Sequence, residues 1–224
     1  MKKNNKEVKQ NNKQANANYV KKIKENKTDY FNMMQFVKLA DLFTLCNAVC
    51  GILSIYFVLN MKIVTAALFI LLATFFDKID GWVARKMGTQ NEFGKQLDSL
   101  CDIISFGIAP AFFGIISVPS LWLIASSLWF KAILVLYLVA VIFYVAAGIL
   151  RLARFNVTDQ SKSFQGLPIT VGGLFIALIV LFVSLVPTYL PVLKPFVSVL
   201  GMLMPLVYLI LGLLMISSIP IRKR

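Results

Sequence analysis

The chain has 224 residues, of which 58% are hydrophobic and only 15% are charged, and its formal net charge is +13. This composition is too apolar for a soluble domain and is typical of a multi-pass membrane protein. The sequence contains no histidine, which excludes histidine-based catalysis and histidine-ligated metals. Its three cysteines show neither a paired framework nor a metal-ligand pattern.

The first 38 residues form a basic and polar tail. Residues 1–18 are rich in lysine, asparagine and glutamine, so we expect them to be disordered. The apolar run at 30–37 is too short to span a bilayer, and its lysine neighbours favour an anionic leaflet, which predicts an amphipathic helix at the membrane interface. The tail has no signal-peptide pattern, so its removal is not expected. We therefore divide the chain into this tail, 1–38, and a membrane domain, 39–224.

Six segments of the membrane domain can carry the roughly 20 residues that a bilayer crossing requires. They are approximately 40–59, 63–87, 93–117, 127–153, 167–187 and 195–217. The expected fold is an all-α integral membrane protein with six transmembrane helices preceded by the interfacial helix.

Basic residues predict the orientation of these helices. Lysines and arginines gather in the tail, around the 88–92 turn, in the 151–166 loop and in the last three residues. Because such residues are retained on the cytoplasmic side, both termini are expected on the cytoplasmic side of the cell membrane. The charge of +13 is then explained by tail and topology, without a nucleic-acid partner.

Four aspartates lie in the apolar sequence of the second and third segments: Asp77, Asp80, Asp98 and Asp102. A carboxylate at the centre of a membrane helix costs roughly 2.5 to 3.5 kcal/mol on insertion scales, so four of them need a compensating partner. Helical spacing places two acids on one face of each segment, and a turn at 87–93 would bring the two faces together. This arrangement predicts a site for one or two divalent cations near the cytoplasmic ends of the helices.

Oxygen ligands without imidazole or thiolate suit hard ions, which favours Mg²⁺ or Mn²⁺, is compatible with Ca²⁺ and disfavours zinc and copper. The residues alone also allow a structural role or a transport role for the acids. They could cap broken helices or pair with Lys78 and Arg85, or they could line the cation pathway of a transporter.

The aspartates and their neighbours resemble the complete signature of the CDP-alcohol phosphotransferases. The family pattern D-x-x-D-G-x-x-A-R-x8-G-x-x-x-D-x-x-x-D is filled at every fixed position between Asp77 and Asp102. The resemblance implies a membrane enzyme, expected to be a homodimer among membrane lipids, that transfers a phosphatidyl group from a CDP-linked lipid to an alcohol and releases CMP. It implies that Asp77 and Asp98 bridge two metal ions, that Asp80 completes one ion, and that Asp102 completes the other or acts as the base.

The same resemblance implies roles for the small and basic residues of the signature. Gly81 and Ala84 would leave room for the cytidine nucleotide, Arg85 would contact its phosphates, and Gly94 would relieve crowding. Both glycines could at the same time serve close helix packing.

Two later segments bear on the acceptor. Arg151-Leu-Ala-Arg154-Phe155-Asn156 and Phe164-Gln-Gly-Leu-Pro168 resemble R-L-A-R-F-N and F-x-G-L-P of the membrane-embedded phosphatidylserine synthases. This implies L-serine as acceptor and CDP-diacylglycerol or an archaeal CDP-ether lipid as donor, with glycerol phosphate or inositol phosphate as alternative acceptors. Arg151, Arg154 and Lys162 are the candidates for holding the acceptor, although the arginines could instead anchor a helix end.

A stripe on the first segment also resembles the family. Thr44, Asn47 and Gly51 recur at three- and four-residue steps, which fits either contact with the CDP-lipid or packing alone. Asp41 follows Ala40 where many members have Pro-Asn, so the role of position 41 is open.

Overall fold

The computed structural model describes residues 39–88, 91–122, 128–157, 164–217 and 220–221. The expected disordered tail and interfacial helix, at 1–38, lie outside these residues. The chain separates into two units, Met1–Lys38 and Leu39–Arg224, and the described helices and strands belong to the second. The homodimer and the roles assigned to the two parts of the chain stay predictions.

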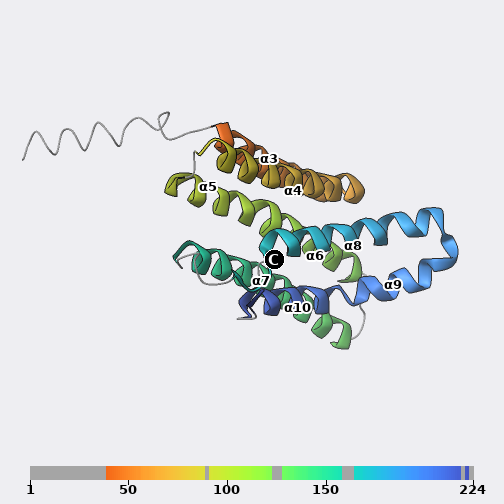
Figure 1. The fold of residues 1–224 in the computed structure, drawn as a ribbon. Coiled ribbons are helices and arrows are strands. Elements are labelled where there is room, and N and C mark those ends of the chain that lie inside the picture. Colours follow the sequence, from red (N-terminus) through yellow and green to blue (C-terminus); the bar gives the residue numbers. More distant parts are fainter. Residues whose placement is uncertain (1–38, 89–90, 123–127, 158–163, 218–219, 222–224) are drawn as a thin grey trace, which may run out of the picture. The chain divides into compact units, whose positions relative to one another are not determined.

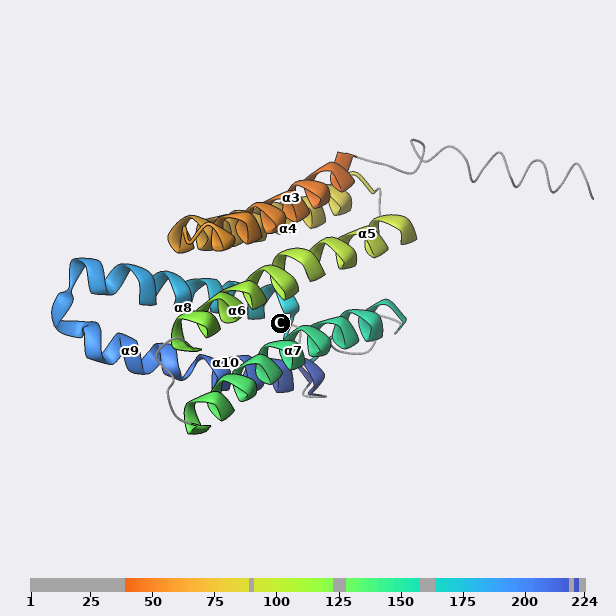
Figure 2. The same ribbon diagram turned by 180° about the vertical axis from the view of Figure 1, so that it is seen from behind.

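The first two helices form an antiparallel hairpin. α3 (Leu39–Leu59) and α4 (Ile63–Lys86) are joined by a tight turn in which Met61 has a positive φ of 59°. The pair lies side by side along its whole length (Figures 1 and 2). Near the turn the hydroxyl of buried Ser54 donates to the carbonyl of Ala66 at 2.8 Å. Alanines at 66, 67 and 73 of α4 are buried, and such small side chains let the helices pack closely.

The third element is one helix interrupted by a π turn. α5 (Glu92–Asp102) continues into η1 (Ile103–Ile108) and α6 (Ala109–Trp122). Before it, α4 ends at Lys86, Gly88 has a positive φ of 61°, and the Asn91 side chain caps α5 by accepting from the Gly94 amide at 2.7 Å. This confirms the expected turn between the two aspartate-bearing helices.

The second half of the unit packs against the interrupted helix. α7 (Leu128–Val157) lies along α10 (Met204–Ile216), and α8 (Ile169–Tyr189) leads through η2 (Pro191–Leu193) to α9 (Lys194–Met202) (Figure 2). Two short strands, β1 (Phe164–Gln165) and β2 (Pro220–Ile221), pair antiparallel. The expected sixth segment is therefore broken at Leu203. Pro205, at the start of α10, cannot donate an amide hydrogen to the preceding turn, which accounts for a boundary there.

Buried tyrosines connect these helices to the π turn. The Tyr144 hydroxyl of α7 donates to the Phe106 carbonyl at 2.6 Å, and the Tyr208 hydroxyl of α10 donates to the Pro110 carbonyl at 2.7 Å. A π turn leaves carbonyl groups outside the regular helical pattern, so such partners stabilise it.

In the part of the chain that the structure describes, four stretches are long and apolar enough to cross a membrane: Ala40–Leu59, Glu92–Ile116, Leu134–Val157 and Ile169–Pro187. Many of their large apolar side chains are exposed, as expected of surfaces that face lipid. α4 has sufficient length at 24 residues, but Asp77, Lys78 and Asp80 make its C-terminal third too polar to be counted with them. The fold is thus all-helical apart from two short strands and fits a multi-pass integral membrane protein, while the count of six spans stays a prediction.

Candidate active site

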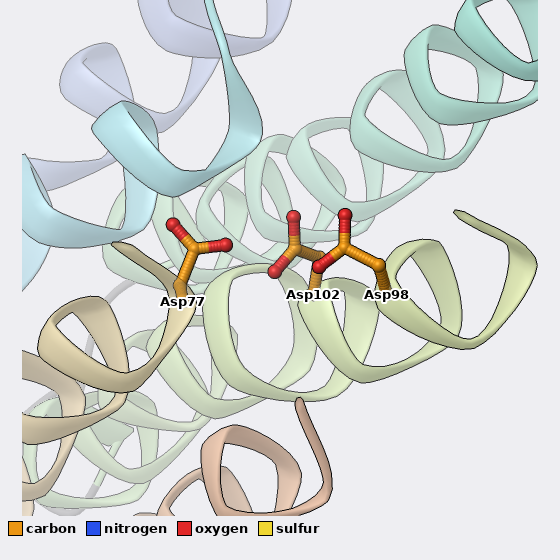
Figure 3. Close-up of side chains that lie close together, drawn as sticks. All are labelled: Asp77, Asp98 and Asp102. Atoms are coloured by element: carbon orange, nitrogen blue, oxygen red, sulfur yellow. The ribbon is translucent and has the colours of Figure 1, made fainter. Parts of the chain in front are cut away.

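Three of the four signature aspartates converge between α4 and α5. One carboxylate oxygen each from Asp77, Asp98 and Asp102 lies within 4.8 Å of the other two. Figure 3 shows the Asp77 side chain pointing from its helix toward the pair contributed by α5. Asp98 and Asp102 stand four residues apart and therefore on the same face of α5, as the sequence predicts. The turn between α4 and α5 thus brings acids from these two helices to one point.

Asp80 lies beside this cluster rather than within it. Its side chain is only 5% exposed, and its carboxylate lies next to Thr44 of α3 and within electrostatic range of Asp98. Thr44 itself donates to the carbonyl of Ala40, one turn earlier in α3, at 3.3 Å. The structure therefore separates the four acids into a group of three and a buried neighbour.

The donor set fits a hard divalent cation. Among the described residues, the buried oxygens Asp80 Oδ2 and Asp98 Oδ1 have no hydrogen-bond partner. Burial of unpaired carboxylate oxygens is costly, and a cation among them would compensate that cost. Four carboxylates without nitrogen or sulfur ligands match the preference of such ions for oxygen.

The N-terminal half of α3 forms one wall of the site. The Asn47 side-chain nitrogen donates to Asp102 Oδ1 at 3.1 Å, and Asn47 is completely buried. Gly51, one turn further along α3, faces the π turn, where a Cβ would lie 2.5 Å from Ser105 Oγ and 2.7 Å from Ser105 Cα. The stripe of Thr44, Asn47 and Gly51 therefore combines contact with two site aspartates and close packing against η1.

The two signature glycines have different surroundings. A Cβ at Gly81 would meet no heavy atom within 4 Å, so the described chain leaves open space there. At Gly94 a Cβ would lie 2.9 Å from Asn91 Oδ1 and 3.0 Å from Asp41 Oδ1, which explains a glycine beside the helix cap. Of the other signature residues on α4, Ala84 is half-buried and Arg85 is exposed.

The two arginines of α7 make different contacts although they are only three residues apart. Arg151 is 8% exposed, its guanidinium lies 5.9 Å from the Phe155 ring centroid, and it is within electrostatic range of Asp102. Within the described part of the chain, its buried Nε has no hydrogen-bond partner. Arg154 instead donates from Nη1 to the Ile216 carbonyl at the end of α10, at 3.5 Å. Lys162, the third residue predicted for the acceptor, lies outside the described residues.

A polar network joins α5 and α7, and the sequence did not predict it. Asn156 accepts from Ser99 Oγ at 3.2 Å, donates to Gln96 Oε1 at 3.2 Å, and its carbonyl accepts from Lys95 Nζ at 3.2 Å. Lys95 also lies 5.6 Å from the Phe155 ring centroid. The asparagine that ends the R-L-A-R-F-N segment was the available signal, because a polar residue at that point needs partners from another helix. The network joins the arginine-bearing end of α7 to the helix that carries Asp98 and Asp102.

Comparison with known proteins identifies the family. A family model described as CDP-alcohol phosphatidyltransferase matches residues 37–213, which is most of the chain. The chain belongs to this family. Membership confirms the resemblance carried by the signature and argues against a cation transporter. The family depends on divalent metal ions, in agreement with the carboxylate cluster.

Several relatives of the chain are named for transfer to serine. An archaetidylserine synthase of Methanothermobacter thermautotrophicus is 41% identical over 145 residues, covering 63% of this chain and 57% of the relative. A CDP-diacylglycerol–serine O-phosphatidyltransferase of Methanocaldococcus jannaschii is 35% identical over 146 residues, covering 65% and 62%. One of the same name from Bacillus subtilis is 33% identical over 138 residues, covering 61% and 71%. The chain thus spans less than two thirds of the length of the first two relatives.

Proposed function

We propose that this protein transfers the phosphatidyl group of CDP-diacylglycerol, or of a CDP-ether lipid, to the hydroxyl of L-serine. The serine oxygen forms a new bond to the lipid-bearing phosphorus, the bond from that phosphorus to the oxygen of CMP breaks, and the hydroxyl proton passes to a base. The products are a phosphatidylserine and CMP. The observation that carries this proposal is the filled aspartate signature in a chain whose matched relatives are named for serine transfer in archaea and bacteria.

The aspartates would hold two Mg²⁺ or Mn²⁺ ions, with Asp77 and Asp98 shared between them. Asp80 would complete one ion, and Asp102 would complete the other or accept the serine proton. Such ions neutralise charge on phosphoryl oxygens and align the nucleophile with the leaving group. The protein contributes carboxylates on two helices that both pack against α3, and a largely buried setting, in which electrostatic interactions are stronger than in water.

The donor nucleotide would lie against the outer face of α4. Open space at Gly81 supports this position, because a side chain there would occupy the volume that a ligand needs. Ala84 would border the same space, and the exposed guanidinium of Arg85 would reach the diphosphate. Arginine suits that role, since its planar fork matches phosphate oxygens.

The acceptor would lie between Asp102 and the end of α7. Arg151 is the preferred partner for the serine carboxylate, because it is buried, carries an unpartnered Nε among the described residues, and lies near Asp102. Serine must lose its hydroxyl proton on attack, and no histidine exists to accept it. Asp102 would therefore accept that proton.

The active site would face the cytoplasm, where serine and CMP are soluble metabolites. Support comes from Arg85, Lys86 and Lys95, which lie at the adjoining ends of the two helices that carry the aspartates, and from Arg154 at the end of α7. Both termini would lie on the same side.

An acceptor-competition assay tests the proposal. Purified protein with CDP-diacylglycerol and Mn²⁺ should release CMP when serine is added, and little when glycerol 3-phosphate or inositol phosphate replaces it. Parallel reactions with a CDP-ether lipid compare the two donor classes. Release of CMP with glycerol 3-phosphate or inositol phosphate but not with serine would overturn the acceptor assignment and leave the transferase chemistry in place.

A further inference from the structure

We propose that Asn47 is a positioning residue that fixes the orientation of the Asp102 carboxylate. This inference rests on the proposed function, because it concerns how one of the site's acids is held. The sequence left open whether Asn47 contacts the CDP-lipid or serves packing alone. We assign it instead a role that acts through Asp102.

The contact between the two side chains is direct and sealed from solvent. Asn47 is completely buried, Asp102 is 6% exposed, and the Asn47 amide nitrogen lies 3.1 Å from Asp102 Oδ1. An amide nitrogen can only donate, so it holds that one oxygen as an acceptor and stops the carboxylate from rotating. With its orientation fixed in this way, the Asp102 carboxylate keeps one oxygen within 4.8 Å of oxygens of Asp77 and Asp98.

The backbone of Asn47 is itself fixed relative to Asp102. The Ser105 hydroxyl, in the π turn that follows Asp102, donates to the Asn47 carbonyl at 2.9 Å. One turn along α3, Gly51 lets the backbone of Ser105 approach so closely that even a methyl group would clash. The helix that carries the donor and the segment that carries the acceptor are therefore held together by two contacts at Ser105, next to the Asn47–Asp102 bond, and such support is what accurate positioning requires.

Stability alone does not explain an asparagine at this position. Among the described residues, the buried Asn47 Oδ1 has no hydrogen-bond partner, and an unsatisfied buried carbonyl destabilises a fold. A leucine would carry no unpaired carbonyl, but it is larger than asparagine and would leave Asp102 Oδ1 without this donor. The bond from the Asn47 nitrogen to Asp102 is therefore the interaction that accounts for an asparagine here.

The test compares Asn47→Leu with Ser54→Ala, a matched loss of a buried hydrogen bond on the same helix. Ser54 is also completely buried but bonds Ala66, near the turn at the far end of the hairpin. We expect Asn47→Leu to lower kcat for CMP release roughly tenfold or more, as loss of partners behind metal-site ligands does, with an unfolding midpoint no lower than that of Ser54→Ala. Ser54→Ala should lower the midpoint and leave kcat unchanged.

A kcat for Asn47→Leu within threefold of wild type would overturn the proposal. So would a fall in kcat that is accompanied by a midpoint lower than that of Ser54→Ala, since this would indicate a structural role. If Asn47→Leu fails to fold, Asn47→Ala removes the same donor without adding apolar volume and is judged by the same two criteria.

A double-mutant cycle on Mn²⁺ binding, followed by electron paramagnetic resonance, tests whether Asn47 acts through Asp102. Asn47→Leu should weaken Mn²⁺ binding no more than Asp102→Asn does, and adding it to Asp102→Asn should cause no further loss. Additive losses would show an independent effect and overturn the proposal. Because this cycle uses the metal alone, it can succeed even if serine proves to be the wrong acceptor.

Discussion

The aspartate centre and the arginine-bearing end of α7 are built differently. Asp77, Asp98 and Asp102 project from two helices, α4 and α5, that both pack against α3, and they converge to within 4.8 Å. Arg151 and Arg154 stand on the last turns of α7, which ends at Val157, and each makes a different contact. We propose on this basis that the aspartate centre carries the chemistry and that the end of α7 carries the choice of acceptor.

The largest expected effect lies in the aspartate centre. Asp98→Asn removes a charge proposed to be shared between two metal ions, so CMP release should fall roughly a hundredfold or more. The variant should still insert and unfold at a similar temperature, because the apolar surfaces are unchanged. Glu92→Gln is a suitable control, since Glu92 is an exposed acid at the start of the same helix. Substantial activity of Asp98→Asn at saturating Mn²⁺ would contradict a shared role for Asp98.

A second experiment divides the roles within the aspartate centre. Calorimetric titration with Mn²⁺ should show weaker binding for Asp77→Asn and Asp98→Asn than for Asp102→Asn, whose main defect should be slow turnover. The reason is that a shared carboxylate contributes to two ions, whereas Asp102 contributes to one at most. Equal losses of affinity in all three variants would remove this division.

Changes at the end of α7 should alter affinity rather than chemistry. Arg151→Ala should raise the KM for serine roughly tenfold, equivalent to about 1.4 kcal/mol of binding, with little change in the KM for the CDP-lipid. Arg151→Lys would show whether the planar guanidinium is needed. Arg154→Ala is the neighbouring comparison, and it should mainly lower the unfolding midpoint because Arg154 bonds the Ile216 carbonyl. An unchanged KM for serine in Arg151→Ala would place the acceptor elsewhere.

The smallest expected effect concerns the open space on α4. Gly81→Ala should leave the unfolding midpoint nearly unchanged, because a Cβ there meets no atom within 4 Å. If the cytidine nucleotide uses that space, the KM for the CDP-lipid should rise a few-fold, and the KM for serine should not. Gly201→Ala, at an equally open position on α9, controls for the general effect of the substitution. Identical kinetics for the two variants would move the nucleotide away from Gly81.

Much of this architecture could be predicted from the sequence because its signals are local. Runs of apolar residues predict segments at 40–59 and 63–87, and the structure has helices at Leu39–Leu59 and Ile63–Lys86. The convergence of Asp77, Asp98 and Asp102 followed from four-residue spacing and a recognisable turn. The position of Asp80 beside the other three acids and the break at Leu203 were harder to predict from the sequence. The position of Asp80 depends on how α3 approaches, and the break depends on Pro205 within an otherwise apolar run.

Contacts between distant segments could not be predicted in the same way. The bond from Asn47 to Asp102 joins residues 55 positions apart, and the bond from Ser99 to Asn156 joins residues 57 apart. Neither pair has a spacing rule, because their proximity depends on how whole helices pack. The π turn after Asp102 belongs to the same class, since its hydrogen bonds to the Tyr144 hydroxyl and to the Asn47 carbonyl are tertiary contacts.

The most direct test of the account follows the serine oxygen itself. L-Serine labelled with ¹⁸O in its hydroxyl is incubated with the protein, CDP-diacylglycerol and Mn²⁺, and both products are analysed by mass spectrometry. Attack by serine on the lipid-bearing phosphorus predicts ¹⁸O in the phosphodiester of the lipid product and none in CMP. Label in CMP, or release of CMP at the same rate without serine, would contradict the proposed reaction.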